Sequence, residues 1–307
     1  MHQTSGRWKL GLLLALTTSF MWGILPIALV GLLKHIDSVT ITWFRFIFAF
    51  IFLIIYLAYF KKLPSRKILN NKRLIILLVI ATIGLLANYI FYMFGLEYST
   101  PESAQLMIQI APMLLLIGSL VIFKESFNLW QGFGFVSFVV GLILFFNHRF
   151  DELLAFENTY SFGVFLIFIA AILWAIYALL QKQLLKYLSS EQVMFIIFAF
   201  GAIVFLPNSS PLELLKLDQL GWWLLLFCGA NTVIAYGAFA ESLVHWEASR
   251  VSAVLAITPL LTLFFMTLTS YYYPDYIQTE EINNLSILGA VLVVVGSAIV
   301  ALVKTKR

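Results

Sequence analysis

Long apolar segments, separated by short polar connections, dominate this chain and leave it few possible folds. A bilayer is crossed by a helix of about 20 residues. Ten segments of suitable length lie at residues 10–33, 39–60, 74–96, 101–123, 129–147, 161–183, 191–207, 220–240, 248–270 and 285–303. Only 11% of the residues are charged, whereas a soluble domain carries roughly 25%. The sequence therefore predicts an all-α integral membrane protein with ten transmembrane helices.

Lys and Arg residues gather on one side of this predicted topology. If the N-terminus is cytoplasmic, 15 of them lie inside, and only Lys34, Arg149 and Lys216 lie outside. Cytoplasmic loops of membrane proteins carry this excess. We therefore expect a multi-pass protein of the cell inner (plasma) membrane with both termini in the cytoplasm. The basic cluster at 61–73 is interpreted as a topology signal beside anionic lipid, not as a nucleic-acid site.

The two halves of the chain resemble each other. Residues 10–48 align without gaps with residues 162–200, and the next two spans of each half align at an offset of 147. Equivalent pairs are Trp22 and Trp174, Lys34 and Lys186, Tyr89 and Tyr236, and Pro112 and Pro259. Each half contains five predicted spans, so the second copy enters the membrane from the opposite side. We predict two inverted five-helix repeats, at 1–147 and 161–307, joined by a connecting loop at 148–160.

One predicted span, residues 101–123, combines sufficient length with polar residues and a proline. Gln105 and Gln109 are four positions apart and so share a helix face. Pro112 leaves a carbonyl unpaired and bends the helix. A proline recurs at Pro259, 147 positions later. A bent, partly polar helix in each half predicts a substrate site between the repeats.

Polar and aromatic residues also recur at helical spacing in several other predicted spans. Amides facing lipid would be costly, so we expect these faces to turn inward and line a cavity. The alternatives are hydrogen bonds that only join helices, at about 0.6 kcal/mol each, and rings that fill the interior or the membrane interface. The candidate substrate-binding residues are Trp22, Asn88, Tyr92, Gln105, Gln109, Trp174, Tyr177, Gln181, Asn231, Tyr236, Ser252 and Thr258.

Arg45 is the one formal charge well inside a predicted span. A buried guanidinium needs a carboxylate or several carbonyls, and Glu97 and Glu102 lie at the same outer edge of the predicted bundle. We expect such a pair to close an outer gate, and snorkelling of Arg45 to the surface is the alternative. Residues with predicted gating roles are Arg45, Glu97, Glu102, Pro112, Pro259 and Glu241.

Several short motifs, taken in order, resemble the EamA-domain branch of the drug/metabolite transporter superfamily. They are Trp22-Gly23, Arg45-Phe46, Tyr92 with Leu96, Ala111-Pro112, Lys124-Glu125 and Thr258-Pro259. The resemblance covers about the whole chain, and it implies a ten-helix secondary transporter with a central cavity between its halves. Such proteins mostly export amino acids and other metabolites, and some import nutrients. The halves differ, since Ile197 stands where Arg45 would map, so we expect them to act differently in gating.

Carboxylates are absent from the middle of every predicted span. Proton relays and sites for cationic drugs commonly use such a group. We therefore expect a formally neutral cavity, suited to zwitterionic or uncharged metabolites, and movement that follows the substrate gradient.

We accordingly predict a monomeric transporter that moves amino acids or related small metabolites, mainly outward, by alternating access. Uptake of a vitamin or nucleoside-like nutrient, drug efflux, and a receptor or structural role in the membrane stay open as alternatives. The lipid bilayer and a small-molecule substrate are the expected partners, with no cofactor, metal or nucleic acid. We do not expect an enzyme, because the sequence has no Gly-x-Ser-x-Gly run, metal-ligand cluster or phosphate-binding glycine loop.

Overall fold

The computed structural model describes residues 5–65, 71–123, 128–155, 158–246, 248–274, 276 and 282–302, and this part of the chain is helical and without strands. Its helices are α1 (Trp8–Leu33), α2 (Ser38–Tyr59), α3 (Lys72–Glu97), α4 (Pro101–Met107), α5 (Ile110–Phe123), α6 (Leu129–Phe145), α7 (Phe150–Ala155), α8 (Thr159–Leu184), α9 (Ser190–Phe205), α10 (Gln219–His245), α11 (Ala248–Leu255), α12 (Thr258–Tyr272) and α13 (Asn284–Leu302). The connection expected as a loop at 148–160 contains the short helix α7. The Lys124-Glu125 motif lies outside the described residues.

Polar residues fix where several helices begin. Asp37 accepts the backbone N–H groups of Val39 and Thr40 at the start of α2, and Asn71 accepts that of Leu74 at the start of α3. The first N–H groups of a helix have no partner within the helix, so these caps stabilise helix ends that leave the apolar layer.

Seven helical segments in the described part of the chain are long and apolar enough to cross a membrane, or eight if a pair bent by 53° at Leu129–Phe145 and Asn147–Leu153 counts as one. The chain is therefore a multi-pass membrane protein. The expected count of ten stays a prediction. The segment predicted at 101–123 is interrupted after Met107, and Asn284–Val300 is apolar but shorter than the other spans.

Apolar side chains cover much of the outside of the bundle. Leu13, Ile55 and Phe133 each expose more than half of their surface, at 61%, 64% and 58%. Exposed apolar area on this scale marks a surface that meets lipid or a partner rather than water.

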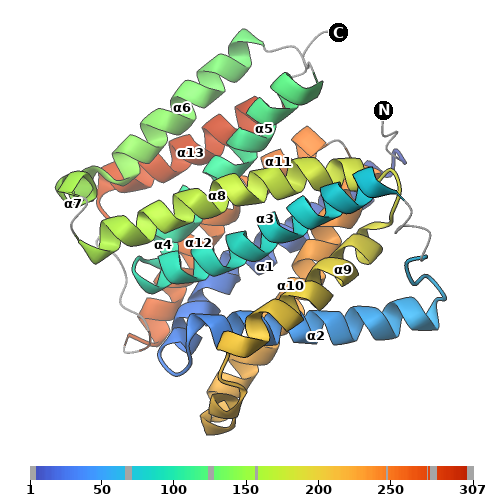
Figure 1. Ribbon diagram of the computed structural model, residues 1–307. Helices are drawn as coiled ribbons and strands as arrows, with labels where there is room; N and C mark the ends of the chain where they lie inside the picture. The colour runs from blue at the N-terminus through green and yellow to red at the C-terminus, as the bar shows by residue number, and fades with distance from the viewer. Residues whose placement is uncertain are drawn as a thin grey trace.

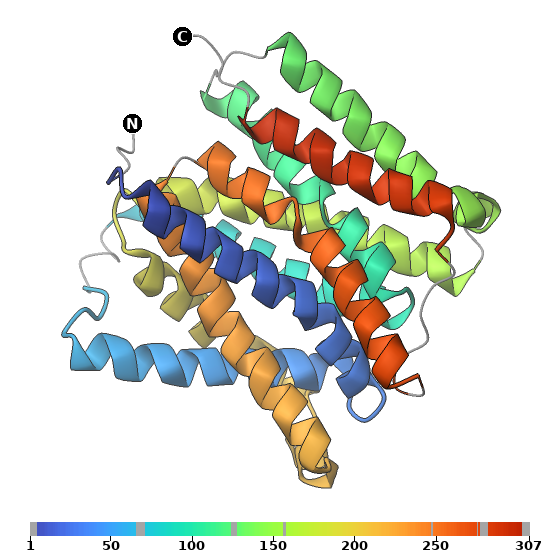
Figure 2. The same cartoon turned by 180° about the vertical axis from the view of Figure 1, so that it is seen from behind.

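Helices from the first half of the chain pack on helices from the second half throughout the bundle. α1 packs on α10 and α12, α3 packs on α8, and α2 packs on α9. α6 and α13 pack on each other at one edge of the molecule (Figure 1), and α13 also packs on α11. α1 begins and α13 ends at the same end of the bundle, which we call the N-terminal face (Figure 2).

Glycines allow α6 and α13 to approach closely. A Cβ atom at Gly141 would lie 2.6 Å from the backbone nitrogen of Val293, and one at Gly296 would lie 2.5 Å from the carbonyl oxygen of Gly134. Close backbone approach through small residues is a common way for helices to associate in membranes.

Candidate functional site

Two helices are broken near the centre of the bundle, one in each half of the chain. α4 ends at Met107 and α5 begins at Ile110, while α11 ends at Leu255 and α12 begins at Thr258. Pro112 and Pro259 follow these breaks within the first turn of the new helix. A proline ring clashes with the carbonyl four residues earlier, and both clashes fall at the breaks.

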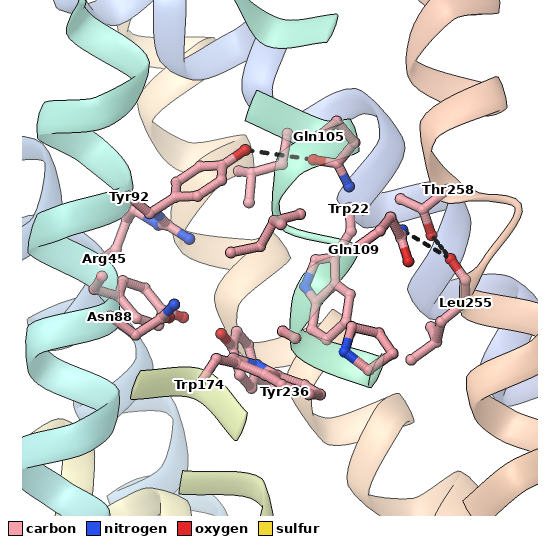
Figure 3. A pocket seen from close by; sticks show the side chains of 15 residues that line it. Trp22, Arg45, Asn88, Tyr92, Gln105, Gln109, Trp174, Tyr236, Leu255 and Thr258 are labelled. Atoms are coloured by element: carbon pink, nitrogen blue, oxygen red, sulfur yellow. Dashed lines mark hydrogen bonds between the residues drawn. The ribbon is translucent and has the colours of Figure 1, made fainter. Parts of the chain in front are cut away.

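The second break leaves a backbone carbonyl free to accept a hydrogen bond from the first half of the chain. The Leu255 oxygen accepts hydrogen bonds from Thr258 Oγ1 at 2.6 Å and from Gln109 Nε2 at 3.4 Å (Figure 3). The two breaks are therefore joined by a hydrogen bond between the halves.

A cavity lies between the broken helices, and its empty space, counted together with its opening to solvent, is about 760 Å³. Its lining residues are Trp22, Leu25, Arg45, Asn88, Tyr89, Tyr92, Gln105, Ile108, Gln109, Ala111, Pro112, Trp174, Tyr236, Leu255 and Thr258. In Figure 3, Arg45, Asn88 and Tyr92 lie across the space from Thr258 and Leu255. The described residues bring together no group of three or more His, Cys, Asp or Glu side chains that could hold a metal ion.

Most of the candidate substrate-binding residues meet at this cavity. The ones that line it are Trp22, Asn88, Tyr92, Gln105, Gln109, Trp174, Tyr236 and Thr258, together with the gating candidates Arg45 and Pro112. Tyr92 donates its hydroxyl to the Gln105 amide oxygen at 3.4 Å, and Asn88 Nδ2 donates to the Ala170 carbonyl at 2.8 Å.

Four substrate-binding candidates lie outside this lining. The Tyr177 hydroxyl donates to the Met194 sulfur at 3.1 Å, and Asn231 Nδ2 donates to the Met21 carbonyl at 2.6 Å. Gln181 is buried in α8, and Ser252 lies in α11. The gating candidates Glu97, Glu102, Pro259 and Glu241 also lie outside it.

Aromatic rings form one end of the cavity. Trp22 makes edge contacts with Trp174 and Tyr236, with ring centres 6.4 Å and 5.2 Å apart. Tyr236 lies 5.7 Å from Tyr89, and Phe239 lies 5.7 Å from both Trp rings. Rings from α1, α3, α8 and α10 thus meet in one cluster and offer flat apolar surface to a ligand.

Arg45 differs most from its expected place. Its Nε atom donates to Thr232 Oγ1 at 3.0 Å, and its guanidinium carbon lies 4.6 Å from the centre of the Tyr89 ring. Glu97 instead accepts a hydrogen bond from Ser38 at 2.7 Å. The structure therefore does not join Arg45 to Glu97 or Glu102. The expectation of a formally neutral cavity is wrong, because Arg45 lines it and none of the lining residues is acidic.

Sequence reasoning also missed some lining residues. Tyr89 was paired with Tyr236 in the repeat alignment, and that equivalence could have identified it. Leu255 contributes a backbone carbonyl, for which the only sequence signal is Pro259 four positions later. Leu25, Ile108 and Ala111 are apolar and carry no signal of their own.

A second cavity, with about 850 Å³ of empty space, lies among α2, α9 and α10 toward the N-terminal face. Lys62, Glu191 and Glu241 give its lining a charged character, and Tyr236 lines both cavities. Glu241 contacts His245 Nε2 at 3.0 Å, and His245 Nδ1 lies 2.7 Å from the Ser5 hydroxyl. The Tyr236 side chain thus separates the central space from one near the N-terminal face.

Known proteins resemble the chain over nearly its full length. The model of the EamA-like transporter family matches residues 9–147 and 161–302. The uncharacterized inner membrane transporter YhbE of Escherichia coli (strain K12) is 37% identical over 297 residues, which cover 97% of this chain and 92% of that protein. An uncharacterized transporter of Haemophilus influenzae is 36% identical over 293 residues, or 95% of each chain. A crystal structure with 15% identity covers 95% of this chain and 98% of its own with a TM-score of 0.67, which shows a shared fold.

Proposed function

The chain belongs to the EamA-like transporter family and is a membrane transporter, and we propose that it moves amino acids or related small metabolites outward by alternating access. The observation that carries this proposal is the cavity between the two helix breaks, which residues from both halves of the chain line. Transporters commonly bind substrate near the membrane midplane, between repeats, where helices are broken.

The helix packing supports a ten-span architecture of two inverted repeats. α1 on α10 and α3 on α8 are equivalent contacts when the two halves are exchanged, as are α1 on α12 and α5 on α8. The α2 and α9 pair and the α6 and α13 pair each exchange into themselves. With the N-terminal face in the cytoplasm, as the distribution of Lys and Arg favours, the second cavity lies on the inner side.

The inner route would open at Tyr236. This residue lies between the central cavity and the charged second cavity, so movement of α10 relative to α2 and α9 would connect them. Glu241 and its partner His245 lie on the same helix, at the inner end of that route. The helix breaks before Pro112 and Pro259 would act as the hinges of this motion.

Counterflow in proteoliposomes tests the function directly. The purified chain is screened for ligands by thermal stabilisation with amino acids, nucleosides, vitamins and cationic dyes, and each hit is then tested for exchange across the bilayer. We expect exchange of an amino acid, its loss in Trp22→Ala, and its retention in Trp223→Ala, since Trp223 is 65% exposed on the outside of α10.

Other results would identify a different function. Exchange of a vitamin or nucleoside would favour nutrient uptake, and exchange confined to permanent cations would favour drug efflux. Ligand binding without exchange would favour a receptor. Concentrative uptake driven by an imposed pH gradient would contradict movement that only follows the substrate gradient.

A further inference from the structure

We propose that Arg45 binds a carboxylate of the transported molecule, so that the cavity selects small metabolites with a single carboxylate over their uncharged analogues. This inference rests on the proposed transport function. It names the group that the site recognises and the residue that recognises it.

The cavity wall carries a positive charge without a carboxylate beside it. Arg45 is 3% exposed and lines the central space, and no acidic side chain shares that lining. A buried charge without a counter-charge is unfavourable by several kcal/mol. The Tyr89 ring and the Thr232 hydroxyl offset part of this cost. An anionic ligand would supply the missing charge.

The Arg45 guanidinium has donors to spare. Its Nε atom donates to Thr232 Oγ1, and this is the one hydrogen bond that the Arg45 side chain makes with the described residues, so its two terminal nitrogens can donate to a ligand. These nitrogens form the planar fork that fits a carboxylate with two parallel hydrogen bonds. The amide group of Gln105 lies on the same lining, next to the Tyr92 hydroxyl, and its nitrogen is a further donor.

The fold does not require a charge at a position like that of Arg45. In the second half of the chain the equivalents of Arg45 and Thr232 are Ile197 and Leu85, by the offsets of 152 and 147. Both are fully buried and belong to one apolar cluster. The fold therefore accepts an apolar pair at this level of the bundle, and the charge in the first half has a different use.

The cavity fits an anion with a single negative charge. One guanidinium balances one negative charge, so a doubly charged phosphate would bring an unbalanced charge into a space whose other lining residues are neutral. Trp22, Trp174 and Tyr92 offer apolar ring surface for the body of the ligand. A monocarboxylate with a compact apolar or flat body fits these features best.

The test uses pairs of probes in which a carboxylate is replaced by an uncharged amide: benzoate and benzamide, indole-3-acetate and indole-3-acetamide, and 4-methylpentanoate and 4-methylpentanamide. Binding to the purified full-length protein is measured by thermal shift and calorimetry at pH 7. We expect the carboxylate of at least one pair to bind at least tenfold more tightly than its amide. This preference should disappear in Arg45→Gln, weaken in Arg45→Lys, which keeps the charge but loses the fork, and persist in the control Arg149→Gln.

Several outcomes would overturn the inference. They are equal binding of both members of every pair, no binding of any probe, and an unchanged carboxylate preference in Arg45→Gln. If Arg45→Gln does not fold, the wild-type preference and the Arg45→Lys variant decide. The proposed function fails separately. A wild-type protein that exchanges a nucleoside but no carboxylate would still be a transporter, and the role proposed for Arg45 would be wrong. Carboxylate binding without exchange would support the role of Arg45 and refute transport.

Discussion

The first half of the chain carries a charge where the second half is apolar, although their backbones are broken and packed in the same way. Arg45 of α2 meets Thr232 of α10 beside the central cavity. The equivalent residues, Ile197 of α9 and Leu85 of α3, are buried in the apolar cluster. Features that set the backbone path are thus shared by both halves, and the chemistry of the cavity wall is confined to one.

The shared features concern geometry. A break precedes a proline in each half, at Pro112 and at Pro259. The Trp22 and Trp174 rings meet at 6.4 Å. The two halves thus share helix breaks and ring contacts, and the residues that differ between them are the ones to examine for specificity.

The largest expected effect comes from adding a positive charge at the equivalent position of the apolar half. Ile197→Arg would bury a guanidinium among apolar side chains with no acceptor prepared for it. An unpaired buried charge destabilises by about 3–5 kcal/mol. We expect a sharply lower unfolding temperature in detergent and poor yield.

The matched control is Ile197→Met, which keeps the side chain apolar and close in volume and should change stability by less than about 1.5 kcal/mol. An Ile197→Arg protein as stable as the wild type would contradict the difference drawn between the two halves. The bundle would then tolerate charge at either position, and the location of Arg45 would carry no functional information.

A smaller loss of stability is expected where the two halves meet symmetrically. A Cβ atom at Gly141 would lie 2.6 Å from the backbone of α13, so Gly141→Val must push α6 and α13 apart. Overpacking of this kind destabilises by about 1–3 kcal/mol. Thermal unfolding measures the loss.

Gly237→Ala serves as its control, because a Cβ atom there meets no other atom within 4 Å. We expect the control to unfold like the wild type. If Gly141→Val does so too, the close approach of α6 and α13 does not stabilise the bundle.

The sequence predicted the elements whose signals are local. Apolar length predicted a multi-pass helical membrane protein, and Pro112 and Pro259 marked the two helices that are broken. Asn88, Gln105 and Gln109 line one cavity as predicted. The shared helix face predicted for Gln105 and Gln109 is wrong, because Gln109 lies in the break between α4 and α5.

The depth of a residue was harder to predict, since it depends on where other helices cross. Arg45 is in the second turn of α2, but α10 crosses α2 with the middle of its length, at Thr232, so the guanidinium lies at the cavity instead of the outer edge. Tyr177 and Asn231 have the expected spacing, yet they lie outside the cavity lining, where they donate hydrogen bonds to the Met194 sulfur and the Met21 carbonyl. Spacing in the sequence predicts which face of a helix a residue is on. It does not predict whether the cavity lies at that residue's depth along the helix.

The smallest expected effect tests the contact that holds Arg45 in place. Thr232→Val keeps the shape of the side chain but removes the hydroxyl that accepts the Arg45 Nε hydrogen bond at 3.0 Å. A hydrogen bond to a charged group contributes about 1.5–3 kcal/mol. The guanidinium keeps its contact with the Tyr89 ring, so we expect the loss of stability to lie at or below the lower end of this range. Carboxylate binding should weaken modestly, and binding of neutral probes should not change.

Leu85→Ile, at the equivalent position of the apolar half, is the control for a change of shape without a change of polarity, and it should leave binding of both kinds of probe unaltered. Equal weakening of carboxylates and amides in Thr232→Val would show that the hydroxyl shapes the cavity without acting through Arg45. A loss restricted to carboxylates would show that Thr232 acts through the guanidinium that it contacts.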